Sequence, residues 1–299
     1  FSVLAENDGV YFTCIPHLWK MTDGDDDGRA DTHEKVASGF GVRVSFIGHD
    51  LHGVIRGPDG RLYFSVGDRG FEFNEKGKSS DGSGKGAVFR CDDDGSNLEV
   101  YAIGLRNPQE LAFDDHGNLF TFDNTGDIGD EARVVYVLDG SDSGWDMAHQ
   151  SAHHYEHALD WGDFHPEKSM WVAENMFQPY REDQPQWVYP PVAHVGEGPS
   201  GVTWLTGEAI PKDLRGSFLL TDYRGSATNS NTHVIQLKPD GAGFALKDVR
   251  QLIEGLAAAD VELGYDGKLY FADFGGGWRV NTNGSVQVLE PKSEALRQE

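Results

Sequence analysis

The sequence predicts an all-β protein, a β-propeller of four-stranded blades, and three observations lead to this prediction. The chain of 299 residues contains 38 Gly, which suits many tight turns between short strands, because glycine adopts positive φ without steric cost. A short pattern recurs along the chain: a turn, a glycine, a variable residue, and a run of apolar and aromatic residues that usually ends in aspartate. The copies lie about one blade length apart.

Five copies of this pattern predict five strands. Their glycines are Gly9, Gly60, Gly117, Gly216 and Gly267. Steps of 51, 57 and 51 residues are near the roughly 40–50 residues of a four-stranded blade, and the step of 99 holds one blade plus an insertion. Strands packed between neighbouring blades must be apolar on both faces, as these runs are. A β-sandwich with similar hairpins is the alternative.

The insertion spans residues 146–190 and is rich in Trp, His and Pro. Its middle, residues 169–180, has the spacing of a short amphipathic helix, and prolines on its C-terminal side prevent a longer one. A loop of this length is usually functional or an interaction surface.

The charge and the cysteines exclude several classes of protein. A net charge of −24 argues against nucleic acid and anionic membrane surfaces as partners, because both need a basic face. No apolar run approaches the roughly 18 residues of a membrane span. Cys14 and Cys91 are too few for a disulfide framework, and either one bridge or two buried free thiols in strands fits them. The chain begins at Phe1 without an initiator Met, so we expect a processed or truncated product.

An acidic segment matches the twelve-residue calcium loop at each expected position. The predicted ligands are the side chains of Asp23, Asp25, Asp27, Asp31 and Glu34 and the backbone carbonyl of Arg29, with Gly28 at the sharp turn. These carboxylates would repel one another without a cation. The flanks, residues 18–21 and 42–46, read as strands, so we expect a structural site in a strand-to-strand loop. A solvated acidic turn is the alternative.

Two further segments carry a resemblance to a known family. The first runs from Gly48-His49-Asp50 to the turn Gly57-Pro58-Asp59-Gly60, and the second holds Arg106-Asn107-Pro108-Gln109, with Asp130-Glu131 some twenty residues later. Together they resemble the glucose/sorbosone dehydrogenases, six-bladed propellers that oxidise sugars with pyrroloquinoline quinone (PQQ) and calcium. The resemblance covers roughly residues 5–285.

The resemblance implies roles for particular residues. His49 would be the general base that takes the proton of the sugar hydroxyl, and Arg106 would stabilise negative charge developing on the quinone. Asn107 and Gln109 would bind the cofactor or its calcium shell, and carbonyls of Thr125 and Gly126 would hold the cofactor calcium. We further expect several side chains to line one pocket, because strand ends converge in a propeller: His49, Arg106, Asn107, Gln109, Asn124 and Asp130, with Arg224 on the far wall.

The sequence departs from the family at its last blade. Where the family has two arginines that bind the PQQ carboxylates, this chain has Leu256-Ala257-Ala258-Ala259-Asp260-Val261. A tricarboxylate without these cations should bind weakly, since a charge-assisted pair is worth roughly 1.5–3 kcal/mol. Arg224 would replace one cation of a neighbouring blade.

A narrower resemblance is to the propeller of large planctomycete and verrucomicrobial proteins described as membrane-bound dehydrogenases with a haem-binding domain. Residues 184–187, 198–201 and 277–278 carry it. These relatives have one more N-terminal blade, so we expect residues 1–299 to form a single domain of about five blades without that first blade. Another chain could then complete the propeller.

Two functions follow as hypotheses. The first is a secreted, periplasmic or extracellular oxidoreductase that transfers hydride from a sugar or polyol to a quinone and passes electrons to a redox partner. The second is a non-catalytic, calcium-stabilised propeller that binds a glycan or a partner protein. The arginine loss and the missing blade favour the second hypothesis, and the His and Arg-Asn-Pro-Gln motifs favour the first.

Overall fold

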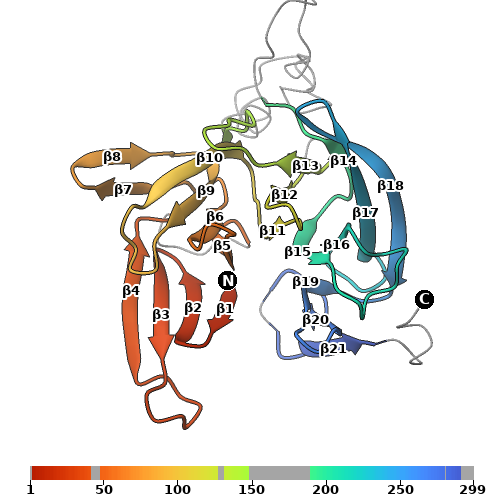
Figure 1. Ribbon diagram of the computed structural model, residues 1–299, viewed down its shortest axis with the longest axis horizontal. Coiled ribbons are helices and arrows are strands. Elements are labelled where there is room, and N and C mark those ends of the chain that lie inside the picture. The colour runs from red at the N-terminus through yellow and green to blue at the C-terminus, as the bar shows by residue number, and fades with distance from the viewer. Residues whose placement is uncertain (1, 42–47, 127–130, 148–188, 280, 291–299) are drawn as a thin grey trace, which may run out of the picture. The chain divides into compact units, whose positions relative to one another are not determined.

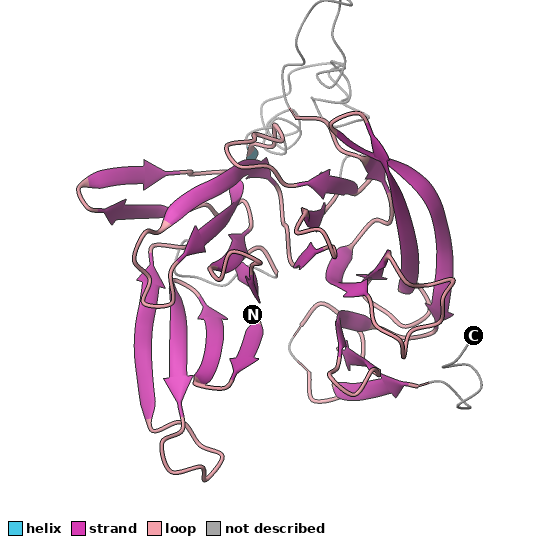
Figure 2. Cartoon of the chain, in the orientation of Figure 1, coloured by secondary structure: helices cyan, strands magenta, loops and turns pink. Residues whose placement is uncertain are grey.

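The structure is a computed structural model, and it describes residues 2–41, 48–126, 131–147, 189–279 and 281–290. The described residues form small antiparallel sheets joined by loops (Figures 1 and 2). Five of these sheets are the blades of a β-propeller, which confirms the predicted fold class. The chain divides into two compact units, and each is described by itself.

The first unit holds two blades and a hairpin. Blade 1 consists of β1 (Val3–Glu6), β2 (Gly9–Cys14), β3 (His17–Thr22) and β4 (Thr32–Ser38). Blade 2 consists of β5 (Leu51–Arg56), β6 (Leu62–Val66), β9 (Gly86–Cys91) and β10 (Glu99–Leu105), and the hairpin is β7 (Glu72–Glu75) with β8 (Lys78–Asp81). Their common core is aromatic: the ring centroid of Phe89 lies 5.3 Å from that of Phe64 and 4.9 Å from that of Phe71.

The second unit holds most of blade 3 and all of blades 4 and 5. Blade 3 consists of β11 (Leu111–Phe113), β12 (Leu119–Asp123), β13 (Arg133–Tyr136) and β14 (Ala193–His194), although Leu111 and Asp123 group with the first unit. Blade 4 consists of β15 (Pro199–Leu205), β16 (Ser217–Asp222), β17 (Asn231–Asp240) and β18 (Gly243–Glu254). Blade 5 consists of β19 (Ala258–Leu263), β20 (Leu269–Asp273) and β21 (Ser285–Leu289), so its described part has three strands.

Each copy of the sequence pattern forms the second strand of its blade. These strands are β2, β6, β12, β16 and β20, and each has a partner on both sides in its sheet. The glycine before each apolar run has a positive φ, for example +82° at Gly60 and +75° at Gly267, which L side chains rarely adopt. Local turn chemistry and an apolar run therefore located the middle of every blade.

The strand after the acidic loop differs from the prediction. It is β4, Thr32–Ser38, and it includes Glu34, which the calcium-loop pattern places within the loop; residues 42–46 lie outside the described residues. The first four residues of β4 are exposed because β4 is the outer strand of its blade and pairs only with β3. An edge strand with both faces in solvent has a polar sequence, which is hard to distinguish from a loop.

Most of the predicted insertion, including its expected helix, lies outside the described residues. Both cysteines are free: Cys91 is buried in β9, and Cys14 is half-buried in β2. Within the described residues, no helix has the length and hydropathy needed to span a membrane.

Candidate active site

His49 stands immediately before blade 2, and its side chain is held by a buried aspartate. Its Nδ1 lies 2.8 Å from Oδ1 of Asp68, at the end of the apolar run that continues β6. The Asp68 side chain is 1% exposed and that of His49 is 14% exposed. An ionised carboxylate can only accept, so His49 donates through Nδ1–H, and neutral His49 then keeps its lone pair on Nε2.

A second histidine contacts the backbone on both sides of His49, and its tautomer decides which of the two contacts is a hydrogen bond. Nε2 of the buried His52 lies 2.8 Å from the Gly48 carbonyl and 3.1 Å from the Asp50 nitrogen. Burial lowers the pKa of His52 well below its usual value, so this imidazole stays neutral near pH 7. His52 therefore positions the loop, whereas His49 keeps part of its ring in solvent.

Trp145 connects His49 to Arg106. The fully buried indole donates from Nε1 to Oδ2 of Asp68 at 3.0 Å, and the Arg106 guanidinium lies 5.6 Å from the centroid of the same ring. A guanidinium over an indole is a favourable cation–π contact. Asp68 thus accepts side-chain donors from His49 and from Trp145, one on each oxygen.

Backbone hydrogen bonds fix the Arg106-Asn107-Pro108-Gln109 segment. Asp123 accepts from the backbone nitrogens of Arg106 and Asn107 at 2.7–3.0 Å, and the Arg106 carbonyl accepts from the Asp68 nitrogen at 2.7 Å. The Ser65 hydroxyl donates to the Pro108 carbonyl. These bonds tie the segment to the strand that leads to Asp68, so the His49 and Arg106 loops share one support within the first unit.

Asn107 contributes an acceptor that has no partner among the described residues. Its side chain is 1% exposed and its Oδ1 receives no hydrogen bond there. A Cβ at Gly67 would come within 2.9 Å of this oxygen, so glycine is needed beside it. A buried unsatisfied oxygen is costly, and it fits a site that a bound donor completes.

The remaining predicted residues are distributed as follows. Gln109 lies beside Gly48, with its Nε2 3.4 Å from where a Cβ of that glycine would stand. Asn124 and the buried Thr125 and Gly126 follow β12 directly, and Asn124 Oδ1 accepts from the Thr125 nitrogen at 2.8 Å. Asp130 lies outside the described residues. Arg224 lies in the second unit, where it forms an ion pair with Glu197.

A comparison of the blades shows what is special about Asp68. The second strand of blades 3, 4 and 5 also ends in an aspartate, and each of these accepts backbone N–H groups: Asp123 from Arg106 and Asn107, Asp222 from Glu197 and Gly198, and Asp273 from Gly275. In blade 2 the described residues give this aspartate two side-chain donors, at 2.8 and 3.0 Å, whereas the His233 side chain in blade 4 lies 3.6 Å from Asp222. The aspartate pattern was visible in the sequence, but the roles of Asp68 and Trp145 were missed.

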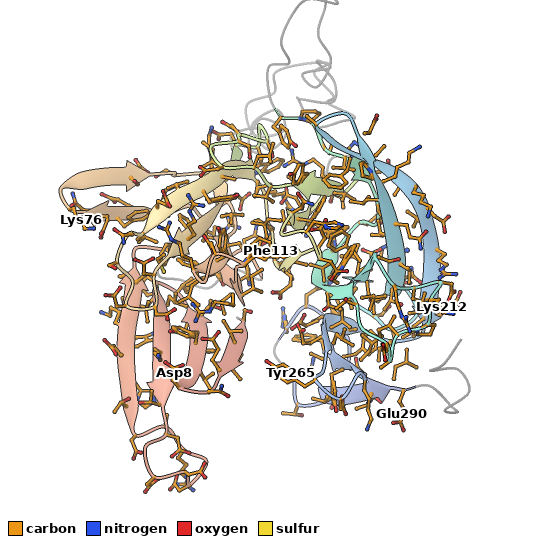
Figure 3. All side chains as sticks on the ribbon, in the orientation of Figure 1. Asp8, Lys76, Phe113, Lys212, Tyr265 and Glu290 are labelled. Atoms are coloured by element: carbon orange, nitrogen blue, oxygen red, sulfur yellow. The ribbon has the colours of Figure 1, made fainter. Side chains whose placement is uncertain are left out.

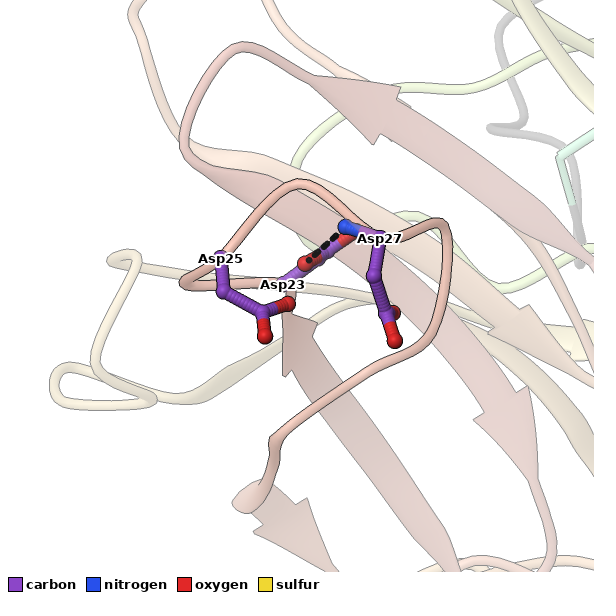
Figure 4. A group of neighbouring side chains, drawn as sticks. All are labelled: Asp23, Asp25 and Asp27. Atoms are coloured by element: carbon purple, nitrogen blue, oxygen red, sulfur yellow. Dashed lines mark hydrogen bonds between the residues drawn. The ribbon is translucent and has the colours of Figure 1, made fainter.

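The acidic loop lies apart, between β3 and β4. The ligand atoms of Asp23, Asp25 and Asp27 lie within 4.8 Å of one another and all three residues are exposed (Figure 4). The N–H of Gly28 donates to Asp23 Oδ2 at 2.7 Å and lowers the pKa of Asp23. Asp31 and Glu34 lie outside this group: Asp31 Oδ2 accepts from the Gly24 nitrogen at 2.7 Å, and Glu34 belongs to β4. Arg29 lies in the same exposed loop.

Solved structures with a similar fold define the class of this propeller. A glucose dehydrogenase aligns with TM-score 0.64 and 17% identity over 95% of this chain and 74% of its own. The PQQ-bound aldose sugar dehydrogenase of Streptomyces coelicolor aligns with TM-score 0.60 and 20% identity over 94% and 73%. The apo-form soluble aldose sugar dehydrogenase of Escherichia coli aligns with TM-score 0.58 and 14% identity over 97% and 77%. The chain therefore has the β-propeller fold of the soluble glucose and aldose sugar dehydrogenases.

The family follows from the sequence. Residues 1–276 match the family described as Domain of unknown function (DUF7133), and the chain belongs to it. No curated protein matches the chain.

Proposed function

We propose that this propeller is an oxidoreductase that oxidises a hydroxyl group of a sugar or polyol, with a quinone as hydride acceptor. The observation that carries the proposal is the His49–Asp68 pair. It gives a partly exposed imidazole whose Nδ1–H is engaged at 2.8 Å and whose Nε2 is the basic atom. A base held in one tautomer by a buried carboxylate is suited to take a hydroxyl proton as hydride leaves the adjacent carbon.

The residues around His49 fit the ring of a quinone. Asn107 Oδ1 offers a buried acceptor for an N–H or O–H group of the cofactor, and Arg106 offers a fixed positive charge. A bound quinone would supply the two-electron acceptor, and the Arg106 guanidinium would stabilise negative charge on a reduced ring oxygen. Asn124, Gln109, Thr125 and Gly126 stand on the neighbouring loops and are proposed to complete the cofactor and metal shell.

The carboxylates of PQQ fit less well. Leu256–Val261 offers no cation, and Arg224 already pairs with Glu197. We therefore propose a quinone that is held more weakly than in the PQQ-bound relative, and we derive no step that depends on its carboxylates.

Calcium is proposed at the acidic loop, separately from the oxidation site. Three hard carboxylates within 4.8 Å, together with the nearby Arg29 carbonyl, are the donors that calcium prefers. Asp31 and Glu34 would join on binding. The ion would stabilise the turn between β3 and β4.

The test is reconstitution of the purified chain. The protein is titrated with PQQ and calcium while the quinone absorbance is followed, and oxidation of a panel of aldoses and polyols is then measured with an artificial electron acceptor. We expect turnover that His49→Gln reduces by about 10²–10⁴, the usual contribution of a positioned general base, with an unchanged melting temperature. Full turnover in His49→Gln would refute the assignment of the base. No oxidation by the wild-type chain with any quinone tested would favour the non-catalytic binding function.

A further inference from the structure

The second unit displays an aromatic ring to solvent on a loop that is built to hold it. Trp278, which follows β20, is 58% exposed. Its indole meets the ring of Tyr223 edge-on, with centroids 5.2 Å apart and planes at 82°. The Tyr223 hydroxyl donates to the Gly277 carbonyl, and the Gly277 nitrogen donates to the Gly225 carbonyl at 2.6 Å. The ring is therefore fixed in place and still left in water.

The loop has a conformation that requires glycine. Gly275, Gly276 and Gly277 have φ values of +77°, +98° and +83°. A Cβ on Gly225 would come within 2.7 Å of the Trp278 ring, so only glycine fits against the indole. Asn281 donates to two carbonyls of the loop, at 3.0 and 3.1 Å. Such a fixed loop loses little conformational entropy when a ligand binds to it.

A planar cation, Arg224, lies between the two residues that contact the ring, and it pairs with a carboxylate, Glu197. Arg224, between Tyr223 and Gly225, forms an ion pair with Glu197, and their side chains are 38% and 59% exposed. The backbone of both is anchored: the Arg224 nitrogen donates to Ser230 Oγ at 2.9 Å, and the Glu197 nitrogen donates to the buried Asp222 at 3.0 Å. The pair offers both donors and acceptors in fixed positions.

We propose that Trp278, Arg224 and Glu197 form a binding subsite for a neutral pyranose. One sugar ring stacks its C–H face on the indole, while the guanidinium and the carboxylate bind its hydroxyl groups. This proposal takes the class of ligand, a sugar, from the proposed function. It adds the residues that hold the sugar. The net charge of −24 favours a neutral sugar over an acidic one.

The surroundings of the ring favour a sugar over a protein partner. Most other large exposed apolar side chains described in this unit lie on strands, namely Leu246 on β18 and Val286, Val288 and Leu289 on β21. A protein interface needs a larger apolar patch at its core. A single flat ring that contacts Tyr223 and Gly225, the two residues on either side of Arg224, is matched instead to a pyranose, which has an apolar face and a perimeter of hydroxyl groups.

The experiment measures binding, not turnover. Intrinsic tryptophan fluorescence and isothermal titration calorimetry are recorded on the full chain with cellotriose, maltotriose, xylotriose and mannotriose. We expect at least one trisaccharide to bind, and Trp278→Ala to weaken its binding at least tenfold, about 1.4 kcal/mol, with an intermediate loss for Trp278→Phe. Tyr265, in the turn between β19 and β20, is fully exposed, and Tyr265→Ala is the control with wild-type affinity (Figure 3).

Separate readouts distinguish this proposal from the proposed function. His49→Gln should bind the trisaccharide like the wild type. If this variant loses turnover and keeps binding, the subsite proposal stands independently of the assignment of the base. Binding by none of the four sugars, or equal affinity in Trp278→Ala, would overturn it. A Trp278→Ala variant that changes the mass of the protein in solution, with unchanged sugar binding, would assign the ring to a protein contact instead.

Discussion

Asp68→Asn tests how the candidate active site holds its base, because it preserves the shape of the side chain and removes one acceptor. Oδ1 of Asp68 accepts from His49 Nδ1 at 2.8 Å, and Oδ2 accepts from Trp145 Nε1 at 3.0 Å. A carboxamide has one acceptor oxygen and one donor nitrogen. It can therefore serve only one of these two N–H groups and must turn a donor toward the other.

The two orientations of the amide have different consequences. If its oxygen stays with Trp145, the amide nitrogen donates to His49 Nδ1, and the imidazole proton moves to Nε2, where it blocks the base. If the oxygen stays with His49, the buried N–H of Trp145 loses its acceptor, which costs about 1–3 kcal/mol. Because Trp145 is fully buried, we expect the first orientation. Turnover should then fall by about 10²–10⁴.

The tautomer is measured directly by nitrogen-15 NMR of the imidazoles, with the His49 signals assigned by comparison with His49→Gln. We expect Nδ1–H in the wild type and Nε2–H in Asp68→Asn, a change that mere loosening of the fold would not produce. Trp145→Phe is the matched control, since it removes the indole N–H and keeps an aromatic side chain. It should retain the Nδ1–H tautomer. An Asp68→Asn protein with Nδ1–H and wild-type turnover would refute the reasoning.

Three further predictions concern stability and reactivity. Calcium at 100 times its dissociation constant should stabilise the fold by about 2.7 kcal/mol, seen as a melting temperature that EDTA lowers; an Asp25→Asn variant with the same calcium response would contradict the site. Burial raises the pKa of the Cys91 thiol to about 12. In the Cys14→Ser variant, Cys91 should therefore resist iodoacetamide at pH 8 until urea unfolds the chain. Rapid labelling of the native variant would show that the thiol is accessible. Burial opposes ionisation of Asp222, but the nearby His233 imidazole and hydrogen bonds from the backbone nitrogens of Glu197 and Gly198 outweigh it and lower its pKa. A lowered carboxyl pKa stabilises the fold above the unfolded value near 3.9, so the advantage of wild type over Asp222→Asn in urea unfolding should shrink as the pH falls from 5 to 3; a constant difference would exclude this linkage.

The fold was predictable because its signal is local. Each blade carries a glycine at positive φ followed within a few residues by an apolar run, and these features depend on neighbours in sequence. The outer strand β4 was not predicted because its exposed residues have no apolar pattern. The β7–β8 hairpin carries no apolar repeat and was not predicted either.

The candidate site was predictable only in part. Family motifs pointed to His49 and Arg106, and the structure ties their loops to one support. The link through Trp145 joins positions 77 residues apart, and no local pattern marks a tryptophan as the donor to one particular aspartate. Contacts of this kind depend on how strands are placed in three dimensions, which turn and strand patterns do not specify.

The aspartate at the end of the second strand of a blade has different hydrogen-bond partners in blade 2 than in blades 3, 4 and 5. In blades 3, 4 and 5 it accepts backbone N–H groups, and in blade 4 it also lies 3.6 Å from His233 Nε2. The same carboxylate therefore stands at the same place in each of these blades. In blade 2 this carboxylate accepts hydrogen bonds from His49 and Trp145, which makes it the partner of the proposed base. Substitutions around Asp68 should therefore reduce turnover more than substitutions around Asp273, and a deep mutational scan scored separately for expression and for turnover would reveal the contrast.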